Sequence, residues 1–193
     1  MIAFSAFSQK QMSYHSIAAA SWEISFPTGN DHFLTKTSLA GGRLEYRRMV
    51  APNISAGLAF SWNSFDEYFN TQTYKTPSGS AVTTDMVRQI YTAPITAIFH
   101  YYPTVKSKLV RPYVGVGLGA QYAEQNIFFN IYEVSGTGWG FVVRPEIGAV
   151  VMFSESAGAL IGFSYNYSTN KNDAFKVNSL QQFAINIGVA GFF

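Results

Sequence analysis

The sequence has no cysteine, no long hydrophobic run and few charged residues. The lack of cysteine excludes a disulfide framework and any thiolate site for a metal or for redox chemistry. The apolar runs, such as Ile17–Ala20 and Ala149–Phe153, are far shorter than the ~18 residues of a membrane-spanning helix. Charged residues make up 12% of the chain, about half of the roughly 25% found in soluble domains. The formal net charge of +2 is too small to indicate a nucleic-acid partner.

What the chain has instead is an alternation of apolar with small or polar residues, together with an aromatic content of 17%. Between Leu180 and Phe193 the odd-numbered residues are mostly large and apolar, and the even-numbered ones are mostly small or polar. Side chains of a strand point alternately to opposite faces. An apolar face opposite a small and polar face is typical of a strand between lipid and a narrow polar lumen.

The same pattern occurs eight times and predicts an all-β protein, an eight-stranded antiparallel up-and-down transmembrane β-barrel. The expected strands are 13–26, 38–49, 53–63, 86–102, 109–123, 138–153, 157–167 and 180–193. Tight connections at 50–52, 103–108 and 154–156 alternate with long polar ones at 27–37, 64–85, 124–137 and 168–179. Short turns on one rim and long loops on the other indicate the bacterial outer membrane, with periplasmic termini and extracellular loops.

Aromatic residues of the outward parity fall near both ends of the expected strands. Amphipathic rings favour the headgroup region, so we expect two aromatic girdles. They comprise Trp22, Trp62 and Trp139 at the long-loop ends, and Tyr46, Tyr101, Phe153 and Phe193 at the short-turn ends. A soluble lipocalin-like barrel would place large apolar groups inside, whereas the inward parity holds Ser55, Gly57, Gly115 and Gly117.

Met1–Ser8 is apolar and ends in Ala6-Phe7-Ser8, which resembles a small-x-small cleavage motif. We expect residues 1–8 to be the remainder of an export signal, and residues 9–193 to be a single outer-membrane β-barrel domain. An ordinary first strand is the alternative, because no positively charged segment precedes the motif.

The chain also resembles the small outer-membrane barrels of the OmpA and OmpW type. The resemblance rests on Arg111–Ala120, on Leu39–Tyr46 and on the terminal Gly191-Phe192-Phe193. It implies insertion by the barrel-assembly machinery, which recognises a final strand that ends in an aromatic residue. Phe192 departs from the pattern, since alternation would place a small residue there.

Ionisable residues gather on the inward parity. A charge facing lipid near the midplane costs roughly 2–4 kcal/mol, so an inward position is strongly favoured. The expected lumen ionic network comprises Glu23, Arg43, Glu45, Arg47, Arg88, Arg111, Arg144 and Glu146. We expect neighbouring strands to bring Arg111 toward Arg144 and Glu146. Five arginines against three glutamates allow an anion-attracting throat. We favour a salt-bridge network that fills the lumen, because eight strands enclose a space only as wide as side chains.

We expect no enzyme, cofactor or metal. Gly115-x-Gly117-x-x-Ala120 lies within a strand, without the helix and acidic residue of a dinucleotide site. His15 and His100 are expected near the periplasmic rim, away from the outer leaflet. His32 lies beside Asp31 in the first long loop, and Asp66, Glu67 and Asp85 lie in the second. Such a cluster could hold a metal or act as a base, but solvated loop residues are the simpler interpretation.

The sequence therefore predicts a structural or interaction role: membrane integrity, loop display, or an accessory subunit of a larger outer-membrane complex. Outer-membrane lipid and lipopolysaccharide are the expected surroundings. The apolar loop residues that suggest a partner are Tyr68, Phe69, Tyr74, Phe128, Phe129, Ile131 and Tyr132; extended strands that pack these side chains together are the alternative. The second hypothesis is an OmpW-like conduit for small hydrophobic molecules, in which Pro94 and Pro145 loosen the wall. A lipid-modifying enzyme ranks third.

Overall fold

The computed structural model describes residues 15–29, 33–75, 81–107, 109–129, 132–172, 175 and 177–193. They form eight antiparallel strands: β1 Ser16–Thr28, β2 Ser38–Ala51, β3 Ile54–Lys75, β4 Ala81–Tyr101, β5 Val110–Phe129, β6 Tyr132–Met152, β7 Ala157–Ser168 and β8 Leu180–Phe192. None of the residues in these ranges belongs to a helix long and apolar enough to cross a membrane. The proposed export segment, residues 1–8, lies outside the described residues.

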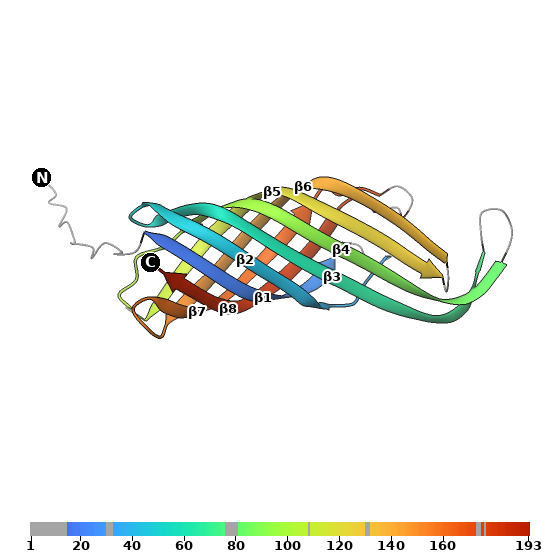
Figure 1. The fold of residues 1–193 in the computed structure, drawn as a ribbon, viewed down its shortest axis with the longest axis horizontal. Helices are drawn as coiled ribbons and strands as arrows, with labels where there is room; N and C mark the ends of the chain where they lie inside the picture. Colours follow the sequence, from blue (N-terminus) through green and yellow to red (C-terminus); the bar gives the residue numbers. More distant parts are fainter. Residues whose placement is uncertain are drawn as a thin grey trace, which may run out of the picture.

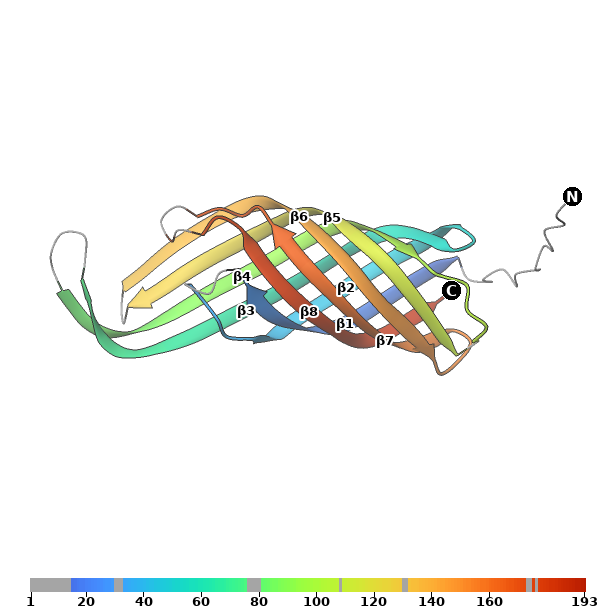
Figure 2. The same cartoon turned by 180° about the vertical axis from the view of Figure 1, so that it is seen from behind.

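Each strand pairs with the next in chain order, and β8 pairs with β1 to close the ring, as Figure 1 and Figure 2 show. The closing ladder runs from Ile17 opposite Phe192 to Thr28 opposite Gln181 without a shift in register. Backbone hydrogen bonds from His15 and Ser16 to the carbonyl of Phe193 fasten the two ends of the ring together. The predicted eight-stranded antiparallel barrel is thus confirmed.

One wall of the barrel is much taller than the other (Figure 1). Strands β3 to β6 have 20 to 22 residues each, whereas β1, β2, β7 and β8 have 12 to 14. The expected loops at 64–85 and 124–137 were therefore wrong, since most of their residues belong to strands. The β3–β4 ladder continues to Lys75 opposite Ala81, and the β5–β6 ladder to Phe129 opposite Tyr132.

The error has a physical cause. The prediction required apolar side chains on the outward face, which holds only where that face meets lipid. Above this zone the outward residues mix polar groups such as Asp66 with apolar ones such as Tyr68, so the alternation weakens. The segments are still rich in Tyr, Phe, Thr and Val, which favour strands. The chain keeps its ladder hydrogen bonds while the polarity of its outward face changes.

The barrel is inside-out in polarity. Outward side chains such as Leu58 and Val189 are 63% and 57% exposed, whereas the inward Glu23 and Arg47 are fully buried. A water-soluble fold would reverse this distribution. The inward and outward parities assigned from the sequence agree with this arrangement for the ionisable residues of β1, β2 and β6.

A polar belt crosses the outward face of the tall wall, below the outward aromatic Tyr68. Asp66, Gln89, Asn126 and Ser135 are opposite one another on successive strands β3 to β6. The Gln89 amide donates to the Asp66 carboxylate at 2.7 Å. Such a row is unfavourable in hydrocarbon, so the wall above it lies in water.

Candidate functional site

The inward faces of three strands carry the main cluster of charged side chains. Glu23 projects from β1, Arg43, Glu45 and Arg47 from β2, and Arg144 and Glu146 from β6; all six lie inside the ring. Strands β2 and β6 occupy opposite sides of the barrel. Their side chains therefore meet across the lumen, not along one sheet.

The six charges form one chain of alternating sign. Glu45 contacts Arg47 at 3.0 Å and Arg43 at 3.1 Å, and Arg43 reaches across to Glu146 at 2.9 Å. Arg144 lies 3.8 Å from Glu146 and 2.5 Å from Glu23. Three guanidinium groups thus face three carboxylates, and the cluster balances its own charge.

Neutral polar side chains surround Glu23 and Arg144, which form one end of this row of ion pairs. The Asn63 amide donates to Glu23 at 2.6 Å, and Arg144 contacts the Ser61 hydroxyl at 3.4 Å and the Asn186 amide oxygen at 3.2 Å. Buried charges are costly unless they are both paired and hydrogen-bonded. The surroundings of Glu23 and Arg144 meet both requirements.

His100 belongs to this cluster, and the sequence analysis missed it. The prediction placed His100 near the short-turn rim, but its ring lies inside the barrel between Arg47 and Glu146 and contacts both. The ring packs on Tyr113 with centroids 4.9 Å apart, and a Cβ at Gly115 would clash with it. The even numbering that His100 shares with Thr96 and Ile98 on β4 was the available signal.

Two arginines of the expected network lie elsewhere. Arg88 is on the tall part of β4, where it donates to the Phe33 carbonyl at 3.0 Å and packs over the Phe33 and Phe69 rings. Arg111 lies near the short-turn rim, 5.0 Å over the ring of Phe192. The expected approach of Arg111 to Arg144 and Glu146 is not among the contacts of these described residues. The central cluster consequently lacks the predicted positive surplus.

An apolar layer lies on each side of the charged cluster. Toward the short turns it comprises Ile17, Ala19, Tyr102, Tyr113, Val150, Met152, Leu160, Ala190 and Phe192. Toward the tall wall it comprises Phe33, Leu34, Phe65, Ile90, Ala123, Val177 and Leu180. An enclosed space of about 10 Å³, lined in part by Arg43, Tyr113 and Glu146, lies between them. That volume holds about one water molecule.

Two connections between short strands contribute residues to the apolar layer on the side of the tall wall. Phe33 and Leu34 come from the β1–β2 connection and Val177 from the β7–β8 connection; the rings of Phe33 and Phe175 lie 5.4 Å apart. Glu67 of β3 accepts hydrogen bonds from the Thr35 amide at 2.7 Å and from its hydroxyl at 2.9 Å. We call Phe33–Thr35, Phe175 and Val177 the cap.

The acidic residues of the tall wall do not converge. Asp66 faces outward in the polar belt, whereas Glu67 faces inward and holds the cap. His32 and Asp31, the other expected members of this group, lie outside the described residues. No group of three or more metal-ligating side chains occurs in the part of the chain that the structure describes.

Pro94 and Pro145, the two prolines expected to loosen the wall, coincide with interruptions of the ladders. The β3–β4 ladder passes from Phe60–Ile95 to Asn63–Thr92, leaving Pro94 out, and the β6–β7 ladder passes from Val143–Tyr167 to Glu146–Ser164, leaving Pro145 out. A proline has no N–H to give a ladder. In the gap beside Pro145, opposite Arg144, the buried side-chain amide of Asn166 has no hydrogen-bond partner among the described residues.

The seven expected girdle aromatics all project from the outer surface. Trp139 and Tyr122 meet edge to face at 5.5 Å, and Trp62 lies 5.9 Å from Phe60. At the short-turn end, Tyr46 and the terminal Phe193 rings are 6.3 Å apart. Trp22 donates its indole N–H to the Leu39 carbonyl at 2.7 Å.

Comparison with known families decides the class of this barrel. A family model described as the outer membrane protein beta-barrel domain matches residues 1–193. The chain belongs to this family. It is an outer-membrane β-barrel, and its charged cluster lies in the lumen of the barrel. A search of curated proteins finds no match.

Solved outer-membrane barrels share the fold. Ail, the attachment invasion locus protein of Yersinia pestis, is 14% identical over 93% of this chain and 99% of its own, with a TM-score of 0.54. A second Ail structure contains the heparin analogue sucrose octasulfate. Neisserial surface protein A is 14% identical, covers 93% of this chain and 97% of its own, and has a TM-score of 0.59. The protease OmpT of Escherichia coli, at 6% identity, covers 98% and 99% with a TM-score of 0.51. At these identities the likeness concerns the fold alone.

Proposed function

We propose that this outer-membrane barrel is a closed anchor that displays its tall β3–β6 wall outside the cell and binds a partner protein there. The observation that carries the proposal is the apolar inner face of the wall beyond the polar belt. On that face Phe69 is opposite Met86, and Phe129 is opposite Tyr132. Tyr132 is 70% exposed, although large apolar groups above a membrane are usually covered.

The orientation belongs to the proposal. The short turns and both termini face the periplasm, and the tall wall faces outward, as in outer-membrane barrels with short periplasmic turns. The outward aromatics serve as the two girdles that border outer-membrane lipid and lipopolysaccharide. Insertion is the task of the barrel-assembly machinery, as the aromatic-ended last strand implies.

The layers described above support a closed lumen. Three arginines and three glutamates balance in the centre, so no excess charge draws ions in. Apolar layers on both sides remove the water that a permeating ion requires. The role of the cluster is therefore to hold the barrel walls together.

The partner that fits best is an extended protein segment. Ladder pairing between β6 and β7 ends at Val142–Ser168, so Tyr132–Ser135 has no neighbouring strand on that side among the described residues. An exposed edge accepts an added strand through main-chain hydrogen bonds, while alternate side chains supply specificity. Tyr132 and Val134 both project from the inner face and are exposed.

Charge disfavours a polyanion of the kind bound by Ail. The convex face of the wall carries Asp66, Glu124 and Glu133, and Arg88 points to the opposite face. A sulfated sugar would meet repulsion on the convex face. The inner face, where the partner is proposed to bind, offers the apolar Tyr132 and Val134, so an uncharged apolar segment is the better match.

A photo-crosslinking pair tests the proposal. A crosslinking amino acid in place of Tyr132 points to the inner face of the wall, and the same amino acid in place of Glu133 points to the convex face. The two variants therefore differ in the face that they probe and hardly in their position along β6. We expect a discrete protein adduct in outer membranes from position 132 and none from 133. Equal yields at both positions, or recovery of the barrel alone, would overturn the partner role.

The second candidate is a conduit for small hydrophobic molecules. The ladder interruptions at Pro94 and Pro145 and the apolar layer that includes the cap favour it. That layer is filled by the chain's own Phe33, Leu34 and Val177, which favours the closed anchor. Saturable binding of a fluorescent fatty acid by the purified barrel, abolished by Val177→Glu, would establish the conduit; the anchor proposal predicts no saturable binding.

A further inference from the structure

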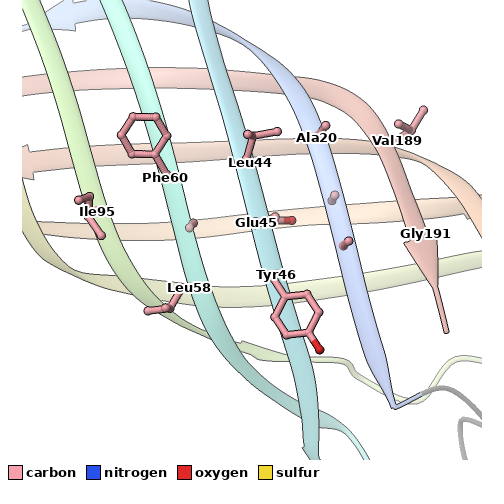
Figure 3. A pocket seen from close by; sticks show the side chains of 12 residues that line it. Ala20, Leu44, Glu45, Tyr46, Leu58, Phe60, Ile95, Val189 and Gly191 are labelled. Atoms are coloured by element: carbon pink, nitrogen blue, oxygen red, sulfur yellow. The ribbon is translucent and has the colours of Figure 1, made fainter.

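A groove centred on β1 lies on the lipid-facing surface. Figure 3 shows Ala20 of β1 between Val189 of β8 and Leu44 and Tyr46 of β2. Ala18 and Ala20 form the floor, and Leu58, Phe60 and Ile95 extend the far wall. The groove has a volume of about 670 Å³ and an almost wholly apolar lining.

The groove exists because β1 lacks bulky outward side chains over part of its length. Ala18 and Ala20 are successive outward residues of β1, and Ala18 lies opposite Gly191 of β8, so three small residues adjoin there. From Ser16 to Ala20 the strand rises about 13 Å. Because such strands tilt by about 35–45°, this length corresponds to about 10 Å along the membrane normal, and half of the apolar band is about 12.5 Å, so the groove reaches across most of one leaflet.

Polar groups gather at the short-turn end of the groove. Arg48 is the next outward residue of β2 after Tyr46, it lies opposite Ser16 of β1, and it is exposed. The Ser16 and Tyr46 hydroxyls are 3.0 Å apart. No ion pair of Arg48 is formed with any residue that the structure describes.

We propose that this groove binds one acyl chain of an anionic phospholipid, whose phosphate is held by Arg48. An apolar slot across most of one leaflet, with a cation and two hydroxyls at its headgroup end, matches a lipid in both shape and charge. With the orientation proposed above, the lipid belongs to the periplasmic leaflet. The binding test below does not depend on that orientation.

A second copy of the chain fits the groove less well. Small residues do allow close approach between membrane proteins. Two copies with the same orientation in a membrane are related by an axis along its normal, so the two Arg48 side chains would meet at one level. Their repulsion opposes a symmetric dimer, whereas a phosphate neutralises the charge.

Native mass spectrometry of the folded barrel with equal amounts of phosphatidylglycerol and phosphatidylethanolamine of identical acyl chains tests the proposal. The unaltered barrel should retain one lipid and prefer phosphatidylglycerol. Ala20→Phe fills the groove and should lower retention of both lipids at least fivefold. Arg48→Gln should leave retention but remove a preference of about fivefold, the factor expected for one basic residue near an anionic surface.

Two matched variants provide controls. Ala149→Phe adds the same ring to an outward position of β6, across the barrel, and Lys106→Gln removes an exposed charge from the same rim; both should behave as the unaltered barrel. Heat-shifted gel mobility verifies that each variant is folded. Unchanged retention in Ala20→Phe, the absence of a headgroup preference, or a dimer that Ala20→Phe abolishes would each overturn the proposal.

Discussion

Glu146 joins the two halves of the ion-pair chain, because its carboxylate contacts Arg43 on one side and Arg144 on the other. Arg144 in turn neutralises Glu23, which is fully buried and otherwise has only Asn63 and Ser25 as hydrogen-bond donors. Replacing one residue of the Glu23–Arg144 pair by a neutral residue leaves the other buried charge without a partner. Replacing both removes the two buried charges together, so no charge is left uncompensated.

Arg144→Met should therefore be strongly destabilising. Breaking a buried pair on one side costs about 3–5 kcal/mol, and Glu23→Gln with Arg144→Met should recover most of that loss. Urea unfolding of the barrel in detergent micelles measures both. Lys106→Met, on the exposed rim, serves as the control; a single Arg144→Met variant as stable as the control would contradict the account.

Residue parity predicted which charges lie inside, but not which of them meet. The alternation along β2 and β6 assigned Arg43, Glu45, Arg144 and Glu146 correctly to the interior. The contact between Arg43 and Glu146 crosses the lumen, and it depends on strand tilt and side-chain reach, which one-dimensional spacing does not contain. The same limit explains why Arg111 was expected beside Arg144 and why His100 was missed.

At the scale of elements, the cap depends on a few hydrogen bonds to the tall wall. Thr35 gives both its amide and its hydroxyl to Glu67, and Arg88 holds the Phe33 carbonyl. Ser38 donates to the Ser64 carbonyl at 2.5 Å, just below them. The β1–β2 connection is thus held to β3 both by the inward side chain of Glu67 and by the backbone carbonyl of Ser64.

Glu67→Ala should release this connection without unfolding the barrel. Both hydrogen bonds of Thr35 are lost, so amide exchange in residues 33–38 should accelerate at least tenfold while the central strands are unaffected. Hydrogen–deuterium exchange with mass spectrometry measures it. Asp66→Ala, one residue away on the outward face, should leave the segment unchanged; an equal effect in both variants would contradict the assignment.

The sequence predicted the number of strands and their short turns, but it did not predict the height of β3 to β6. The criterion of an apolar outward face detects a strand only within the membrane, and Asp66, Gln89 and Asn126 removed that signal above it. Pairing of Tyr68 with Val87, and of Val87 with Phe128, carries the ladder further. These cross-strand contacts are recognisable only once the register is known.

At the scale of the whole molecule, the absence of cysteine makes the orientation directly testable. Ser135→Cys places a unique thiol on the tall wall, and Ser154→Cys places one in the β6–β7 turn. A membrane-impermeant maleimide should label position 135 in intact cells and position 154 only after the outer membrane is permeabilised. The reverse pattern would show that the proposed orientation is inverted.

The central claim is that a self-neutral cluster between two apolar layers closes the lumen. Single-channel recording of the purified barrel in a planar lipid bilayer tests this claim most directly. The account predicts no steady conductance above the bilayer background over a range of voltages and salt concentrations. A stable open pore with reproducible ion-conducting steps would contradict it.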